Sequence, residues 1–137
     1  MAKLHFKYGV MNCGKSDTLI KTAYNYREQG LTAVVIKPSV DTKSPNVVAR
    51  AGGSVGVDIM VEPQTDIPAA LDALQLPGID CVLCDESQFL TPKQAEQLFE
   101  IAKKRNISVI AYGLKVDFAT HLFPGSKRLL ELADNIS

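Results

Sequence analysis

The sequence predicts an α/β domain with a mainly parallel sheet, because strand and helix patterns alternate along the chain. Short apolar or alternating runs typical of strands take turns with longer segments whose apolar residues recur at helical spacing. The 137 residues are 46% hydrophobic and 22% charged, which suits one domain with its own core. No repeat or linker interrupts the pattern, so residues 1–137 are expected to form a single domain.

The first strand and helix are predicted near the N-terminus. Residues 4–8 alternate apolar and polar side chains and stop at Gly9, as a short strand does. From 16 to 29, apolar positions recur at helical spacing, and Gly30 supplies a helix stop.

A buried strand and an exposed loop are expected next. The β-branched run 33–36 predicts a strand that ends before Pro38. Residues 38–56 are rich in Ser, Pro, Asn and Gly and indicate a loop, in which 47–49 could form a minor strand.

The second half of the chain continues the alternation. Segment 57–61 alternates like a strand, and Asp66 can cap a helix over 67–75. Segment 79–84 is almost entirely apolar, which is typical of a strand buried on both faces.

Two more helices and a strand complete the prediction. Thr91 to Gln94 forms a capping box with proline at the first helical position, ahead of an amphipathic helix. A strand over 109–112 and a short helix over 126–133 follow. Ligands of parallel sheets bind at the carboxyl ends of strands, so the chemistry is expected just after Tyr8, Cys84 and Tyr112.

A phosphate-binding loop follows the first strand. The pattern G-x-x-x-x-G-K-[ST] is matched in full by Gly9, Val10, Met11, Asn12, Cys13, Gly14, Lys15 and Ser16. The backbone N–H groups of such a loop surround a phosphate, Lys15 would reach the β- and γ-phosphates of ATP, and the Ser16 hydroxyl would bind Mg²⁺. The alternative is a glycine turn with an exposed lysine. The motif predicts a three-layer α/β/α P-loop NTPase of the RecA-like kind.

Two carboxylates end the buried strand 79–84. Asp85 could hold Mg²⁺ through water, and Glu86 could take a proton from an attacking hydroxyl or orient a water molecule. The alternative is a strand that ends in solvated acids.

Composition excludes several classes of protein. Fifteen basic and fifteen acidic residues give a formal net charge of zero, which argues against nucleic acid or anionic membranes as partners. The N-terminus lacks a signal-peptide pattern, and no apolar run approaches the ~18 residues of a membrane span. Three cysteines favour a reducing compartment, and we expect a cytoplasmic protein.

The remaining cysteines and histidines carry less weight. Cys81 and Cys84 form a C-x-x-C, but residues three apart in a strand face opposite sides, so a zinc or redox pair is rejected. Cys13 is expected to fill space in the loop, with a reactive thiol as the alternative. His5 and His121 have no evident partners and are interpreted as structural or solvated.

Six segments in order give the chain a resemblance to the type II thymidine kinases. It opens with Phe6-x-Tyr8-Gly9-x-Met11-Asn12-x-Gly14-Lys15-Ser16 and continues through Tyr24-Asn25-Tyr26, Lys37-Pro38-x-x-Asp41, Asp85-Glu86-Ser87-Gln88-Phe89, Tyr112-Gly113-Leu114-x-x-Asp117-Phe118 and Phe123-x-Gly125-Ser126. The resemblance implies transfer of the γ-phosphoryl group of ATP, with Mg²⁺, to the 5′-hydroxyl of thymidine or deoxyuridine.

The resemblance also implies roles for single residues. Glu86 would be the general base, Asp85 would support the metal, and Gln88 would belong with the phosphate-binding residues. The nucleoside pocket would be formed by Met11, Phe89, Leu114, Phe118 and Phe123. A tetramer and feedback binding of dTTP would follow the family habit.

The chain departs from the family at three places. Lys43 stands where an arginine is usual, and Ala119 replaces another basic side chain. Family members continue past Asp134 into a zinc ribbon and a lasso loop over the nucleoside, and we expect neither these nor zinc ligands in the 137 residues. The alternative functions are therefore a truncated or non-catalytic nucleotide-binding module and, with less support, another P-loop ATPase.

Overall fold

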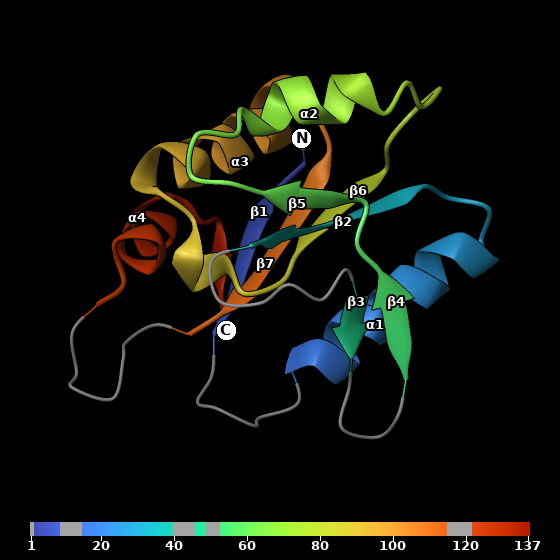
Figure 1. The fold of residues 1–137 in the computed structure, drawn as a ribbon, viewed down its shortest axis with the longest axis horizontal. Coiled ribbons are helices and arrows are strands. Elements are labelled where there is room, and N and C mark those ends of the chain that lie inside the picture. The colour runs from blue at the N-terminus through green and yellow to red at the C-terminus, as the bar shows by residue number, and fades with distance from the viewer. Residues whose placement is uncertain (1, 9–14, 40–45, 49–52, 115–121) are drawn as a thin grey trace.

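A six-stranded parallel sheet forms the centre of the computed structural model, which describes residues 2–8, 15–39, 46–48, 53–114 and 122–137 (Figure 1). Every pair of neighbouring strands runs parallel, in the order β5-β2-β6-β7-β1-β8. The strands are β1 (Leu4–Tyr8), β2 (Ala33–Pro38), β5 (Ile59–Val61), β6 (Cys81–Cys84), β7 (Ser108–Gly113) and β8 (Asn135–Ile136).

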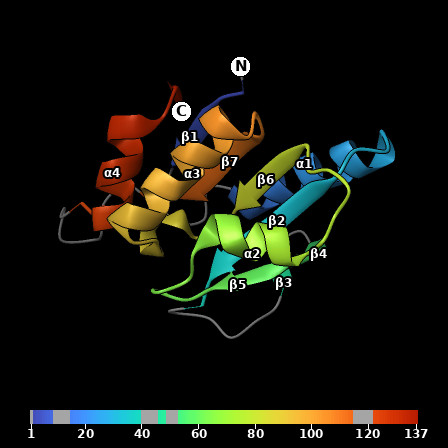
Figure 2. The same cartoon turned by 90° about the horizontal axis from the view of Figure 1, so that it is seen from above.

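Helices cover both faces of the sheet (Figures 1 and 2). One face packs against α1 (Lys15–Glu28) and a hairpin of β3 (Asn46–Val48) and β4 (Ser54–Gly56). The other face packs against helices from the second half of the chain, which are α2 (Ile67–Ala73), α3 (Pro92–Lys104) and α4 (Pro124–Leu132). The three layers confirm the predicted α/β/α architecture.

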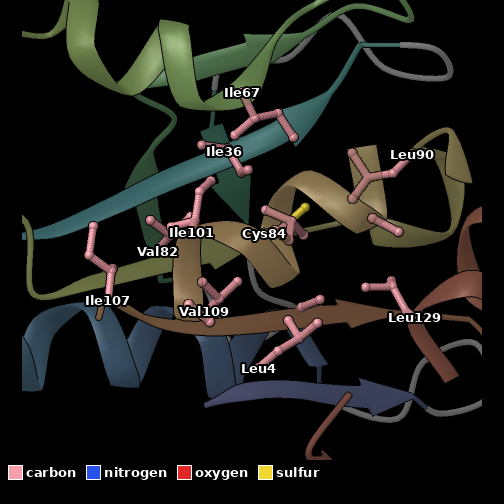
Figure 3. Packing of buried hydrophobic residues seen from close by; sticks show 14 of the residues in the cluster. Leu4, Ile36, Ile67, Val82, Cys84, Leu90, Ile101, Ile107, Val109 and Leu129 are labelled. Atoms are coloured by element: carbon pink, nitrogen blue, oxygen red, sulfur yellow. The ribbon is translucent and has the colours of Figure 1, made fainter. Parts of the chain in front are cut away.

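Alternation of side chains along the central strands divides the core in two. Val34 and Ile36 of β2 join the cluster under α2 and α3, whereas Ala33 and Val35 join the cluster under α1. Figure 3 shows the first cluster, in which Ile36, Val82 and Cys84 lie close to Ile101 of α3. Apolar residues on both faces explain why these strands have nearly continuous apolar sequences.

Several predicted strand and helix boundaries were wrong by a few residues. The strand expected from residue 57 begins at Ile59, because Asp58 is engaged by Val35: its carboxylate accepts from the Val35 N–H at 2.8 Å, and its own N–H donates to the Val35 carbonyl. The strand expected from residue 79 begins at Cys81, since the Asp80 side chain accepts from the Thr32 N–H.

The observed ends of two helices also differ from the predicted ones by one or two residues. The second helix stops at Ala73 rather than residue 75, and Gln75 has a left-handed φ of 54°. The last helix spans Pro124–Leu132 rather than 126–133, since Phe123 is its N-cap and proline suits the first turn.

Three short elements escaped prediction. The segment expected to be a loop contains both strands of the β3–β4 hairpin, of which only a minor strand at 47–49 was expected. A 3₁₀ turn, η1 (Ser87–Phe89), follows the two carboxylates, and β8 adds a strand beside β1. Within the described ranges, no helix is long and apolar enough to cross a membrane.

Candidate active site

The carboxyl ends of β1, β7 and β6 meet at one edge of the sheet. Strand β7 lies between the other two, with Tyr8 opposite Gly113 and Cys84 opposite Ala111. Two neighbouring parallel strands are about 4.8 Å apart, so the ends of β1 and β6 are about two strand spacings apart. The candidate site therefore lies at the edge that the sequence predicted, after Tyr8, Cys84 and Tyr112.

Part of the predicted phosphate loop falls outside the described residues. These are Gly9, Val10, Met11, Asn12, Cys13 and Gly14, together with the side chains of Lys15 and Ser16. The backbone of Lys15 begins α1, directly after β1 and the undescribed segment. Phe118 of the predicted nucleoside pocket, His121, Lys43 and Ala119 also lie outside the described ranges.

Asp85 and Glu86 leave β6 at the site edge with different surroundings. Asp85 is 4% exposed, and its N–H donates to the Ile36 carbonyl at 3.0 Å, which continues the β2–β6 pairing by one step. Glu86 is partly buried and has φ 52° and ψ 40°, a left-handed conformation that is uncommon for residues with a side chain. This conformation turns the chain out of the sheet and into η1.

The side chain of Gln88 reaches back to Glu86. Its Nε2 donates to Glu86 Oε2 at 3.1 Å, and its Oε1 accepts from the Leu114 N–H at 3.1 Å. Gln88 is only 3% exposed. The turn after β6 is thereby hydrogen-bonded to the end of β7.

Two aromatic side chains meet at the turn that follows the carboxylates. The rings of Phe89 and Phe123 meet edge to face, with centroids 5.7 Å apart, and both residues are half-buried. Leu114 is also half-buried. Of the five predicted pocket residues, the structure brings together Phe89 and Phe123, and Leu114 is hydrogen-bonded to the same turn. Such apolar surfaces beside polar groups suit a flat organic ligand.

Tight packing joins α4 to the turn η1. A Cβ at Gly125 would lie 2.3 Å from the Leu90 carbonyl oxygen, so only glycine fits there. The Ser126 hydroxyl, fully buried, donates to the Leu114 carbonyl. Sequence reasoning gave Ser126 no role, although Phe123-x-Gly125-Ser126 was part of the resemblance and signals this contact.

The oxygen donors at the edge fit a magnesium ion. Asp85 and Glu86 offer carboxylate oxygens there, and Mg²⁺ prefers carboxylate, hydroxyl and water oxygens as ligands. Among the described side chains, no three His, Cys, Asp or Glu residues gather to hold a metal ion by themselves.

The C-x-x-C pair does not form a single site. Cys81 packs in the cluster under α1, and Cys84 packs in the cluster under α3 on the opposite face. Burial raises the pKa of Cys81 to about 11. Burial, followed by the charges of Asp85 and Glu86, raises the pKa of Cys84 well above its usual value. Both thiols are therefore poor nucleophiles. Their placement on opposite faces agrees with the prediction, made from their spacing, that they do not form a zinc or redox pair.

His5 lies away from the carboxylates, at the β1–β8 edge. Its Nδ1 is 3.1 Å from Asn135 Nδ2, and desolvation followed by the charge of Lys7 lowers its pKa. The contact supports the structural interpretation of His5.

Comparisons with known proteins agree on one family. The family model described as thymidine kinase matches residues 2–137. The chain is 40% identical over 139 residues to a thymidine kinase of Ruegeria pomeroyi, covering 99% of this chain and 70% of that protein. It is 41% identical over 138 residues to a thymidine kinase of Enterobacteria phage T4, covering 99% and 72%. A thymidine kinase of Legionella pneumophila strain Lens is 42% identical over 141 residues, covering 99% and 66%.

Proposed function

The chain belongs to the thymidine kinase family, and from this premise we propose that its site transfers the γ-phosphoryl group of ATP to the 5′-hydroxyl of thymidine or deoxyuridine. The observation that carries the proposal is the arrangement around Glu86. Its partly buried carboxylate is linked through Gln88 to the end of β7, and Phe89 of the turn that follows packs against Phe123 at the start of α4.

Catalysis in this proposal rests on positioning and charge. Glu86 accepts the proton of the 5′-hydroxyl as that oxygen attacks the γ-phosphorus. Lys15 and the N–H groups of Gly9 to Gly14 hold the phosphates of ATP, with the N-terminus of α1 adding positive potential. Ser16 and Asp85 would hold Mg²⁺, which neutralises charge on the phosphate oxygens.

The nucleoside side of the site is proposed from side-chain chemistry. Phe89 and Phe123 offer an edge-to-face aromatic surface for the base, and Leu114, Met11 and Phe118 would complete the pocket. dTTP would bind by placing its base in the same pocket. The resemblance further supports a homo-oligomer, a tetramer by family habit. We also propose a cytoplasmic location, which the two free buried cysteines Cys81 and Cys84 support.

Formation of dTMP from Mg-ATP and thymidine tests the proposal, with Glu86→Gln as the comparison. We expect Glu86→Gln to lower kcat by about 10²–10⁴-fold, because the glutamine keeps the shape of the side chain but accepts no proton. ATP binding, measured by calorimetry, stays unchanged in Glu86→Gln. Equal turnover in the two proteins would remove Glu86 from its role.

A nucleotide-binding module without transfer activity is the second candidate. The chain spans 66% to 72% of the length of the relatives described above. It is favoured if ATP binds but no dTMP forms.

A further inference from the structure

The side-chain amide of Gln88 connects two parts of the site that lie 26 residues apart in the sequence. A backbone N–H can only donate, so the Leu114 N–H fixes which end of the amide faces β7. The Oε1 must therefore face Leu114, and the NH₂ group is left for the Glu86 carboxylate, 3.1 Å away. Both ends of the amide are engaged, and the orientation of Gln88 is determined by its partners.

Gly113 makes room for this amide. A Cβ at Gly113 would lie 2.8 Å from Gln88 Oε1 and 3.0 Å from the Gln88 backbone nitrogen. Since Gln88 is 3% exposed, water competes little for its hydrogen bonds, which are stronger in such a low-dielectric setting. The space for Gln88 therefore depends on the absence of a side chain at the end of β7.

The main chain of Leu114 is held from its other side as well. Its carbonyl accepts from the Ser126 hydroxyl, which lies in the first turn of α4. Phe123, the N-cap of that helix, packs on Phe89 of η1. Leu114 is thus fixed between Gln88 and Ser126, within the same unit that carries the two aromatic rings.

Resting on the proposed function, we propose that Gln88 is a positioning residue that couples the Leu114 main chain, and with it the nucleoside pocket, to the carboxylate of Glu86. Glu86 sits in a left-handed turn between β6 and η1, outside regular strand and helix pairing. The hydrogen bond from Gln88 holds the Glu86 carboxylate toward the end of β7. A nucleoside that binds against Leu114 then orients Glu86, the general base. A shift of Leu114 would free the Glu86 carboxylate from this orientation.

Kinetics of two Gln88 variants test the coupling. Gln88→Met removes both hydrogen bonds at similar volume, whereas Gln88→Glu keeps an acceptor for the Leu114 N–H but, when ionised, has no donor for Glu86. We expect kcat to fall about 10- to 100-fold in both variants, because the general base Glu86 is misplaced. The KM for ATP should change less than about threefold, because the general base does not hold ATP. Gln88→Glu keeps the experiment decisive if Gln88→Met fails to fold.

Gln94 provides a matched control. It is a buried glutamine, 2% exposed, whose amide donates to the carbonyls of Glu62, Pro63 and Thr65. Its hydrogen-bond partners, which also include Thr91, are other residues than the carboxylates and the aromatic pair of the site. Gln94→Met should lower thermal stability and leave kcat within about twofold of the unmodified chain. A purely structural role for Gln88 would make its variants behave like this control.

An NMR measurement tests the link without catalysis. In ¹⁵N–¹H spectra of the full chain, the Leu114 amide resonance should move in Gln88→Met and also in Glu86→Ala, but not in Gln94→Met. An unmoved Leu114 resonance in Gln88→Met, or unchanged kcat in both Gln88 variants, would overturn the coupling. If the unmodified chain forms no dTMP, the proposed function fails, and the Leu114 resonance alone decides whether Gln88 makes the link.

Discussion

Single glycines decide whether the site can assemble. At Gly125 the first turn of α4 approaches the Leu90 carbonyl so closely that no Cβ fits. Because both sides of this contact are main chain, rotation of a side chain cannot relieve it, and a Cβ at Gly125 would displace either α4 or the end of η1 beside Gln88 and Phe89. The identity of this residue therefore affects both packing and the site.

The substitution Gly125→Ala tests this contact. We expect it to lower the free energy of unfolding by about 1–3 kcal/mol, because its Cβ would lie 2.3 Å from the Leu90 oxygen. Gly78→Ala is the matched control, since a Cβ at Gly78 meets nothing within 4 Å, and its effect should stay within about 0.5 kcal/mol. Urea unfolding of both variants gives the comparison, and equal stabilities would contradict the close approach.

The side-chain groups of the site could be predicted from residue types, whereas its main-chain contacts could not. Asp85 and Glu86 were found because carboxylates at the end of an apolar strand carry their chemistry in their side chains. The bond from the Leu114 N–H to Gln88 could not be found in this way, because a main-chain donor looks the same at every residue. Gln88 was assigned to phosphate binding, which stays a prediction, whereas its observed partners are Glu86 and Leu114.

At the scale of the elements, an ionic contact of Asp134 connects the end of the chain to β1 and α3. The Asp134 carboxylate accepts from the Leu4 N–H at 2.8 Å and from Lys103 Nζ of α3 at 2.7 Å. These hydrogen bonds, that from Lys103 first, lower the pKa of Asp134. The contact joins β1, α3 and the segment that leads into β8.

The lowered pKa predicts how stability depends on pH. A carboxyl group with a pKa below its unfolded value stabilises the fold above about pH 4, and this contribution is lost as the pH falls through the folded pKa. Asp134→Asn should therefore destabilise the chain at about pH 7, and the difference should shrink at about pH 3. Urea unfolding at both pH values measures it. A difference that grows on acidification would contradict the assignment.

Long, periodic elements were predictable and short ones were not. The helix α3 followed from its capping box, in which Thr91 and Gln94 exchange hydrogen bonds as the sequence indicated. By contrast, β8 has two residues, both exposed, and forms only because β1 offers a free edge to it. Two residues carry no periodicity, so pairing of this kind depends on the tertiary structure rather than on local sequence.

At the scale of the whole molecule, the parallel sheet brings separate motifs to one edge. The prediction of parallel strands was sufficient to place the ends of β1, β6 and β7 at the same edge, since the carboxyl ends of all strands share an edge in any such sheet. The strand order was not predicted, because it depends on which apolar faces pack together. That order puts β7 between the other two, so Gly113 and Leu114 lie in the middle of the site.

The most direct test of the account is release of ADP from Mg-ATP by this chain, with and without thymidine, with Lys15→Ala as the blank. We predict release that requires both thymidine and Lys15, because the 5′-hydroxyl is the acceptor and the lysine holds the transferred phosphate. Release at the same rate without thymidine would contradict the kinase reaction and indicate an ATPase. Binding of ATP with no release under either condition would contradict phosphoryl transfer by these 137 residues.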